Sequence, residues 1–149
     1  MNEIIRLTLI NLDEICAFDQ VCFPLEYNSR ETWIELLEDP GTLVFSIKER
    51  GNIAALISIY NWKGQDDYIK IMTIATHPDQ RGKGHAHRLM QYIIDEMLKE
   101  DMRKFRAETR ESNFKMQKVF EDFGYTLASK VDGVYQNPDE AGFKYALDL

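Results

Sequence analysis

The strongest restriction on the fold comes from an apolar segment that leads through a glycine-containing turn into a long amphipathic helix. Residues 68–76 are almost continuously apolar, which is typical of a central strand covered on both faces. Residues 86–98 repeat apolar side chains at helical spacing, and Gly82 and Gly84 lie between the two segments. A strand followed by a covering helix predicts an α/β (α+β) domain.

The remaining segments supply more strands and helices around this unit. Strands are predicted at residues 4–9, 43–48, 53–60, 105–109, 125–130 and 143–147, with a turn at Gly51-Asn52. Helices are predicted at residues 11–23, 29–38 and 113–123, where Ser29 and Gly124 suit the capping positions. We therefore expect a single domain, residues 1–149, with a mixed sheet of about six to seven strands flanked by about four helices.

Composition and charge exclude several classes of protein. The chain is 44% hydrophobic and 29% charged, as in ordinary globular domains. No apolar run approaches the ~18 residues of a membrane span, and residues 1–19 lack the pattern of a signal peptide, so we expect a cytoplasmic protein without a membrane partner. A net charge of −7 disfavours nucleic acid and suits a cationic amine. Cys16 and Cys22 show no metal-ligand spacing, so reduced thiols and no metal are expected.

The turn before the long helix has the chemistry of a phosphate site. A helix N-terminus carries unpaired N–H groups and a partial positive charge, and glycines let the backbone approach an oxyanion. Arg81, Lys83 and Arg88 add basic side chains to this turn. A Walker loop is excluded because Gly84 follows the lysine, and a dinucleotide fingerprint is excluded because His87 replaces its last glycine. A turn without a ligand is the alternative.

Two motifs resemble those of a known family. Residues 81–86, Arg-Gly-Lys-Gly-His-Ala, match the Q/R-x-x-G-x-G/A signature of the GNAT superfamily of N-acetyltransferases. Residues 107–113, Ala-Glu-Thr-Arg-Glu-Ser-Asn, and the helix that ends at Gly124-Tyr125 are similar to its second landmark. The resemblance covers nearly the whole chain and is greatest to the RimI-like group of ribosomal-protein alanine N-acetyltransferases. It implies the GNAT fold and transfer of an acetyl group from acetyl-CoA to a primary amine.

The same resemblance implies which residues contact acetyl-CoA. The end of the central strand would pair with the pantetheine arm, the turn would hold the pyrophosphate, and the start of the following landmark helix would contact the pantetheine. The implied cofactor-binding residues are Ile74, Ala75, Thr76, Arg81, Gly82, Lys83, Gly84, His85, Ala86, His87, Asn113 and Phe120. A capping role is the alternative for Asn113, and a surface position is the alternative for His85 and His87.

The resemblance also implies that Glu108 is the general base. An ammonium must lose a proton before its nitrogen can attack a thioester. The alternative is a solvent-facing glutamate that pairs with Arg106 or Arg110. Many members of the family carry a glutamate near the start of the fourth strand, but Lys70 occupies that place here and closes that route.

The expected general acid is missing, because Phe120 stands where the family commonly carries a tyrosine. Phenylalanine has no proton to give, and its simplest role is in the core. Three alternatives follow: the thiolate leaves unaided, Tyr125 or Tyr135 replaces the acid, or the chain is a catalytically idle acyl-CoA-binding regulatory module.

The acceptor amine remains open at this stage. Resemblance to the RimI-like group favours a protein or peptide N-terminus. The acidic pairs Asp66-Asp67 and Asp139-Glu140 suit a small cationic amine, and residues 25–28 depart from the pattern of the RimI-like group. A homodimer is also an open alternative.

Overall fold

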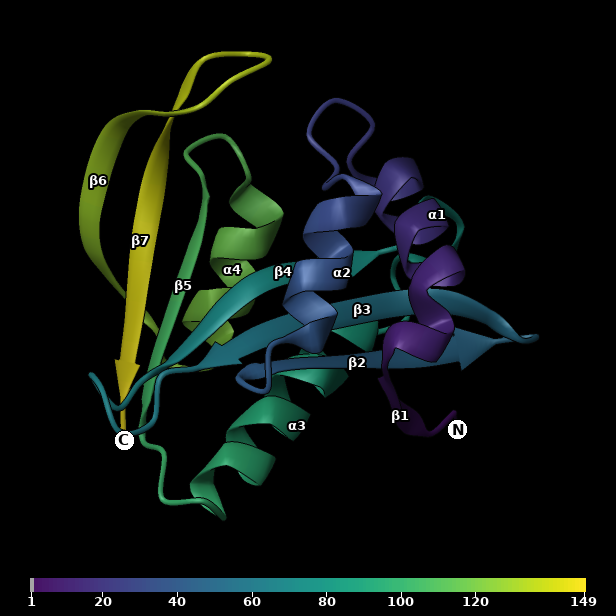
Figure 1. Ribbon diagram of the computed structural model, residues 1–149. Coiled ribbons are helices and arrows are strands. Elements are labelled where there is room, and N and C mark those ends of the chain that lie inside the picture. Colours follow the sequence, from purple (N-terminus) through teal and green to yellow (C-terminus); the bar gives the residue numbers. More distant parts are fainter. Residues whose placement is uncertain (1) are drawn as a thin grey trace.

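The computed structural model describes residues 2–149 and contains a seven-stranded sheet with four α-helices (Figure 1). The strands are β1 (Ile4–Leu7), β2 (Thr42–Glu49), β3 (Asn52–Asn61), β4 (Ile69–Thr76), β5 (Lys104–Arg110), β6 (Thr126–Tyr135) and β7 (Glu140–Asp148). The helices are α1 (Leu12–Cys22), α2 (Arg30–Glu38), α3 (His85–Leu98) and α4 (Phe114–Asp122), with short 3-10 turns η1 (Leu9–Asn11) and η2 (Pro78–Gln80). This arrangement confirms the predicted fold class.

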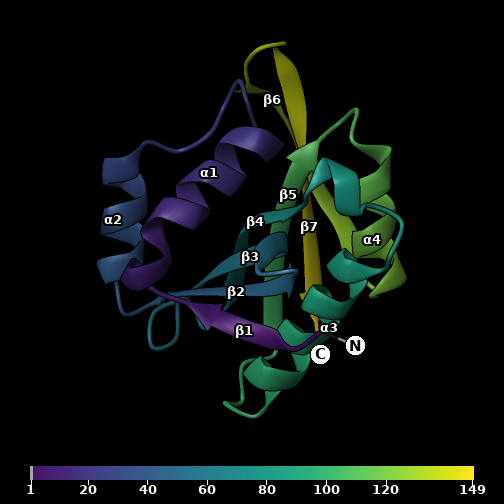
Figure 2. The same ribbon diagram turned by 90° about the vertical axis from the view of Figure 1, so that its right-hand side faces the viewer.

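The helices cover the sheet from both sides, with α1 and α2 on one face and α3 and α4 on the other (Figure 2). The apolar stripe of α3, which includes Leu89, Met90 and Ile93, packs against the middle strands in the larger of two core clusters. The smaller cluster contains Ile15, Phe18 and Trp33 from α1 and α2. Because apolar side chains line both faces of the central strands, those strands carry nearly continuous apolar sequence.

The sheet opens between β4 and β5, and this opening positions the site. Its order is β1-β2-β3-β4-β5-β7-β6, and only the β4–β5 pair is parallel. Two positions of that pair are in register, Ile69 with Phe105 and Lys70 with Arg106. Beyond them the two strands diverge (Figure 1). The rest of β4 therefore has one edge without a strand partner, at the centre of the sheet.

Three predictions of local structure are wrong in detail. The first strand ends at Leu7 rather than at residue 9, because residues 9–11 form η1 and the Thr8 amide donates to Asn11 Oδ1 at 3.0 Å. The β2–β3 turn is Arg50-Gly51, both with positive φ, as a tight hairpin turn requires. The last two strands are longer than predicted, because the register shift and the exposed residues of β6 hide its alternation.

The predicted caps are confirmed. Ser29 Oγ accepts a hydrogen bond from the Thr32 amide at 3.1 Å, and Gly124 has a φ of +87° just beyond α4. Cys16 and Cys22 are both free cysteines, as expected. Among residues 2–149, no helix is long and apolar enough to cross a membrane.

Candidate active site

The N-terminus of α3 presents backbone N–H groups beside the predicted glycines. Gly84 caps the helix with a φ of 78° and contributes no side-chain cap. The first helical hydrogen bond runs from Arg88 N–H to Gly84 O, so the preceding amides of the first turn lack helical acceptors. The first turn contains no acidic residue, unlike the first turns of α1 and α2. Backbone donors in a first turn that has no acidic residue of its own suit a phosphate, and the nearby carboxylate of Glu49 is paired with Lys83.

The space around these glycines also suits a diphosphate. A Cβ placed on Gly82 or Gly84 would meet no atom within 4 Å, so open space lies directly against the backbone there. The ammonium of Lys83 already has two partners within the protein, because its Nζ contacts Glu49 Oε2 at 3.0 Å and Gln80 Oε1 at 2.7 Å. Arg81 makes no ion pair within the described residues, so its charge is available at this turn.

The end of β4 has a backbone edge without a strand partner, next to the glycine-containing turn of residues 81–84, which we call the cradle. Ile74, Ala75 and Thr76 pair with β3 on one side and have no strand partner on the other. In a strand, alternate N–H and C=O groups point to opposite edges, so the open edge presents unpaired donors and acceptors. An extended amide-containing chain such as pantetheine could pair there.

The histidines of this segment have different environments. His85 is buried, with 6% of its surface exposed, and its Nε2 lies 3.4 Å from Glu49 Oε1. A surface position for His85 is therefore wrong, because the side chain turns inward under the β2–β3 hairpin. His87 is exposed, and its Nε2 lies 2.9 Å from Asp122 Oδ2 on α4.

Asn113 at the start of α4 and Phe120 within it both have structural roles. Asn113 caps this helix, because its Oδ1 accepts from the Met116 amide at 3.1 Å. Phe120 is fully buried, and its ring centroid lies 5.6 Å from Tyr125 and 5.3 Å from Tyr145. The predicted core role of Phe120 is confirmed. No proton donor stands at this position on α4.

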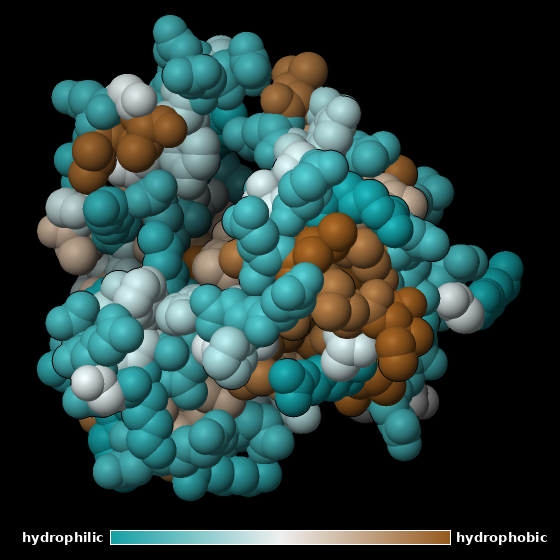
Figure 3. Space-filling model, viewed as in Figure 1, coloured by the Kyte–Doolittle hydropathy of each residue, from teal (hydrophilic) through white to brown (hydrophobic). Residues whose placement is uncertain are grey.

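A cavity of about 370 Å³ lies where β4 and β5 diverge. It is lined by Tyr60, Trp62, Lys70, Ile71, Met72, Glu108 and Tyr135. The space-filling view shows a hollow in the surface between the β6–β7 side of the molecule and helices α1 and α2 (Figure 3). Glu108 lies on β5, half-buried, and brings its carboxylate into a cavity with aromatic walls.

Glu108 is not held by the arginines beside it. Arg106 pairs with Asp148 at 2.8 Å, and Arg110 pairs with Glu26 at 2.9 Å and with Glu140 at 3.2 Å. The alternative in which either arginine pairs with Glu108 is therefore wrong. Its carboxylate instead lies beside Tyr135 in the cavity.

The two tyrosines proposed to replace the acid are placed very differently. Tyr125 is 2% exposed in the core, away from the cavity. Tyr135 lines the cavity, and burial together with the nearby Glu108 carboxylate raises its pKa well above the usual value. Since the raised pKa keeps the phenol protonated, Tyr135 is a permanent hydrogen-bond donor in the cavity.

Arg110 joins the two loops that border this cavity. Besides its two carboxylate partners, it donates to the carbonyl oxygens of Gln136 and Pro138 and lies 4.7 Å from the ring centroid of Tyr135. Glu26 lies in the α1–α2 loop, and the other partners lie in and beside the β6–β7 turn. The guanidinium therefore fixes both loops and the tyrosine.

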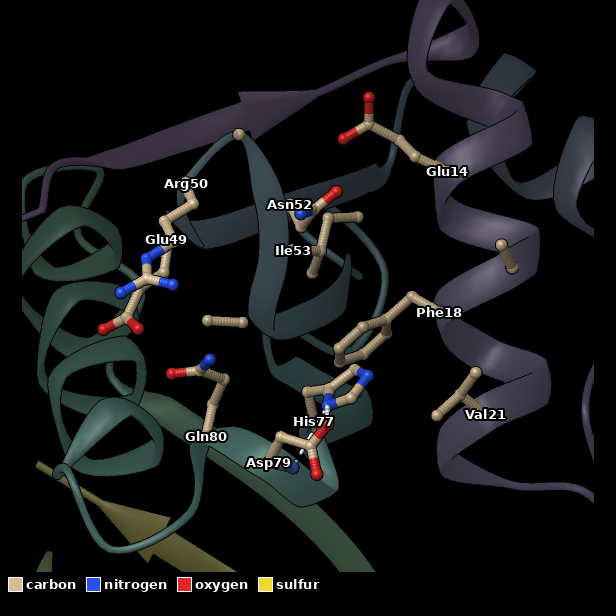
Figure 4. A pocket seen from close by; sticks show the side chains of 13 residues that line it. Glu14, Phe18, Val21, Glu49, Arg50, Asn52, Ile53, His77, Asp79 and Gln80 are labelled. Atoms are coloured by element: carbon tan, nitrogen blue, oxygen red, sulfur yellow. Dashed lines mark hydrogen bonds and ion pairs between the residues drawn. The ribbon is translucent and has the colours of Figure 1, made fainter.

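A second hollow, of about 530 Å³, lies between α1, the β2–β3 turn and η2 (Figure 4). Phe18, Val21 and Ile53 form part of its apolar wall, and Figure 4 shows the carboxylates of Glu14, Glu49 and Asp79 around it. Carboxylates repel phosphate groups. Three carboxylates around one hollow therefore disfavour an anionic cofactor there.

Comparison with known protein families decides the identity. The model of the acetyltransferase (GNAT) family matches residues 10–125. The chain belongs to the GNAT acetyltransferase family. It is an acetyl-CoA-dependent N-acetyltransferase with the fold and the cofactor class of that family. No curated protein matches the chain in sequence.

Solved structures show the same GNAT fold over the full chain. The ribosomal-protein-S18-alanine N-acetyltransferase from Escherichia coli has a TM-score of 0.89 at 23% identity, over 99% of this chain and 94% of its own. NAA60 from Arabidopsis thaliana, in complex with a bisubstrate analogue, gives 0.84 at 10% identity, over 99% and 98%. A spermidine N-acetyltransferase SpeG chimera from Vibrio cholerae and hSSAT gives 0.81 at 16% identity, over 98% and 95%.

Sequence reasoning missed several residues of this GNAT site. Tyr60 lies in β3 and Trp62 follows directly after that strand, and their ring centroids lie 4.7 Å apart beside the cavity. Their period-2 spacing was a usable signal that both rings share one face of a strand. The pairing of Arg110 with Glu26 joins residues 84 positions apart, and local sequence carries no sign of it.

Proposed function

We propose that this GNAT enzyme acetylates a primary amine that binds in the cavity between β4 and β5, with Glu108 as the general base. The observation that supports the proposal is the position of Glu108, which lines that cavity without an arginine partner. The acceptor is a small-molecule amine or a peptide N-terminus. The cofactor would lie along the open edge of β4, with its diphosphate at the N-terminus of α3.

The proposed reaction uses the chain's own groups in two places. Bound acetyl-CoA supplies the thioester carbonyl as the electrophile. The carboxylate of Glu108 accepts a proton from the acceptor ammonium, directly or through one water, and so frees the nitrogen lone pair for attack. The aromatic rings of Tyr60 and Trp62 limit water in the cavity and face the cationic amine with their π-systems.

Tyr135 is the proposed replacement for the missing tyrosine of α4. Its hydroxyl would donate a hydrogen bond to the departing thiolate sulfur, because it lines the cavity, whereas the hydroxyl of Tyr60, the other phenol there, donates to the Asp39 carboxylate. Fixed donors aimed at a charge that develops during the reaction stabilise the transition state.

The role of Glu108 is tested by the Glu108→Gln variant. We expect kcat/KM to fall by about a hundredfold or more, because an amide cannot accept the proton, while the affinity for acetyl-CoA stays unchanged. Thiol release from acetyl-CoA measures turnover, and calorimetric titration measures cofactor binding. Glu111→Gln is the matched control, because Glu111 pairs with Lys130 at 3.3 Å outside the cavity.

Full activity of Glu108→Gln would show that another group is the base. The acceptor panel contains peptides with free N-termini, polyamines, amino acids and aminoglycosides. If the wild-type enzyme binds acetyl-CoA tightly but releases no thiol with any of these amines, an acyl-CoA-binding regulatory module replaces the proposed function. Phe120 at the position of the family acid is the observation behind that second candidate.

A further inference from the structure

The acceptor cavity carries two opposite charges that do not neutralise each other. Lys70 from β4 and Glu108 from β5 both line it. In the part of the chain that the structure describes, neither side chain makes an ion pair within 4.0 Å. Lys70 is exposed and Glu108 is half-buried, and charged side chains that line a cavity without a partner favour a ligand with complementary charges.

The sheet register explains how the two charges come to face one ligand. Lys70 is the register partner of Arg106 in the parallel β4–β5 pair, and Glu108 lies two positions further along β5. Side chains two residues apart share one face of a strand, so Lys70 and Glu108 project from the same face. Their backbones lie about 8 Å apart or more, from ~4.8 Å between strands and ~6.6 Å along two residues.

The neighbouring cations differ from Lys70 in this respect. Arg106 and Arg110 are engaged by carboxylates, as described above. Lys144 lies opposite Glu108 in the β5–β7 register and is exposed, as Lys70 is, but it does not line the cavity. Lys70 is therefore the cation of this cavity that is available for a substrate group.

We propose that the acceptor is an amine that carries a carboxylate a few bonds from its nitrogen, with the ammonium at Glu108 and the carboxylate at Lys70. This inference rests on the proposed function and names the substrate class of that same site. Tyr60, Trp62 and Met72 add apolar surface for the rest of the acceptor. A polyamine would place a second cation near Lys70, and this repulsion disfavours it.

The carboxylate has two sources, which matched pairs of probes distinguish. The first pair is L-leucine and L-leucinamide, which tests the carboxylate of a free amino acid. The second pair is the C-terminally amidated peptides Ala-Asp and Ala-Asn, which tests an acidic side chain next to a peptide N-terminus. Dissociation constants are measured through tryptophan fluorescence, since Trp62 lines the cavity, with the enzyme saturated with CoA.

The deciding quantity is the ratio of affinities for the acid and the amide, compared between wild type and Lys70→Gln. An acid and its amide differ in amine pKa, but this difference affects both proteins equally. We expect the preference for the acid to fall about fivefold or more in Lys70→Gln, the effect of losing ~1 kcal/mol from one ion pair, for at least one probe pair. Lys70→Arg should retain most of it, and Lys144→Gln should leave it unchanged.

The inference would be overturned if Lys70→Gln left the acid-to-amide affinity ratio unchanged for both probe pairs. It would also be overturned if Lys144→Gln lowered that ratio as much as Lys70→Gln does. The probe pair whose acid-to-amide affinity ratio falls in Lys70→Gln identifies the source of the carboxylate. Thiol release measured with the same probes separates the two proposals. If the acid-to-amide affinity ratio depends on Lys70 but no thiol is released, the inference is supported and the transferase function is contradicted. If thiol is released but the affinity ratio does not depend on Lys70, the transferase function is supported and the inference is overturned.

Discussion

At the scale of single residues, the cavity depends on side chains whose protonation is set by their surroundings. Tyr135 has a raised pKa because it is partly buried and lies near the carboxylate of Glu108. A phenol that stays protonated at every working pH acts as a donor and does not contribute a negative charge. Glu108 is thus the acidic group of the cavity, and Tyr135 is its neutral partner.

The two tyrosines can be separated by removing one hydroxyl at a time. Tyr135→Phe should lower kcat by about tenfold or more, because the leaving thiolate loses a hydrogen-bond donor. Tyr125→Phe should leave kcat unchanged, since its hydroxyl lies in the core without a hydrogen-bond partner among the described residues. Steady-state kinetics on both variants measure this, and a loss of kcat confined to Tyr125→Phe would assign the donor role to the core tyrosine instead.

At the scale of elements, the start of α3 differs from the starts of α1 and α2. Asp13 and Glu14 lie in the first turn of α1, and Glu31 lies in that of α2, where each complements the helix dipole. α3 begins with glycine and histidine and has no acidic residue in its own first turn. Because the N-terminus of this 14-residue helix faces open space, it is suited to bind an external anion.

Gly84→Asp tests this element directly. A carboxylate placed at the helix start would repel the cofactor phosphates, so we expect the affinity for acetyl-CoA to fall about a hundredfold or more. Gly64→Asp is the matched control, because Gly64 has a similar φ of +86° and open surroundings in the β3–β4 loop. It carries the same backbone strain far from the cradle.

Calorimetric titration with acetyl-CoA compares the two variants. Equal affinities in Gly84→Asp and in the wild type would contradict a phosphate site at α3. A similar loss in Gly64→Asp would attribute the effect to backbone strain.

At the scale of the whole molecule, the surroundings of the proposed acceptor cavity are assembled from distant segments. Arg110 on β5 connects the α1–α2 loop through Glu26 with the β6–β7 turn through Glu140. The side chain of Arg110 is 17% exposed, so its ion pairs are better protected from solvent than most in this chain. Breaking a partly buried ion pair leaves carboxylates without a partner, which destabilises their loops.

Arg110→Gln should therefore raise the KM for the acceptor about tenfold while the affinity for acetyl-CoA stays the same. The free energy of unfolding should fall by about 2–3 kcal/mol, because two carboxylates lose a charged partner. Arg103→Gln is the control, since Arg103 is 58% exposed and pairs only with Asp101. Kinetics with the preferred amine and denaturant unfolding test both expectations, and an unchanged acceptor KM would show that the loops hold their positions without Arg110.

Much of the fold and part of the site could be predicted from local sequence. The stripe of α3, the caps at Ser29 and Gly124 and the glycines of the turn are each set within a few neighbouring residues. The length of β6 could not be predicted, because its residues are mostly exposed and lack alternation. The burial of His85 also escaped prediction, because Glu49, its neighbour in space, lies 36 positions earlier in the chain.

The sequence by itself determined the order of strands and helices, the open helix start and the identity of Glu108 as the candidate base. Each of these depends on backbone conformation or on a motif within about a dozen residues. The tertiary structure alone decided that Glu108 shares a cavity with Lys70, Trp62 and Tyr135. The physical reason is that this meeting depends on the divergence of β4 from β5 and on the register of the strands around them, which no local stretch of sequence encodes.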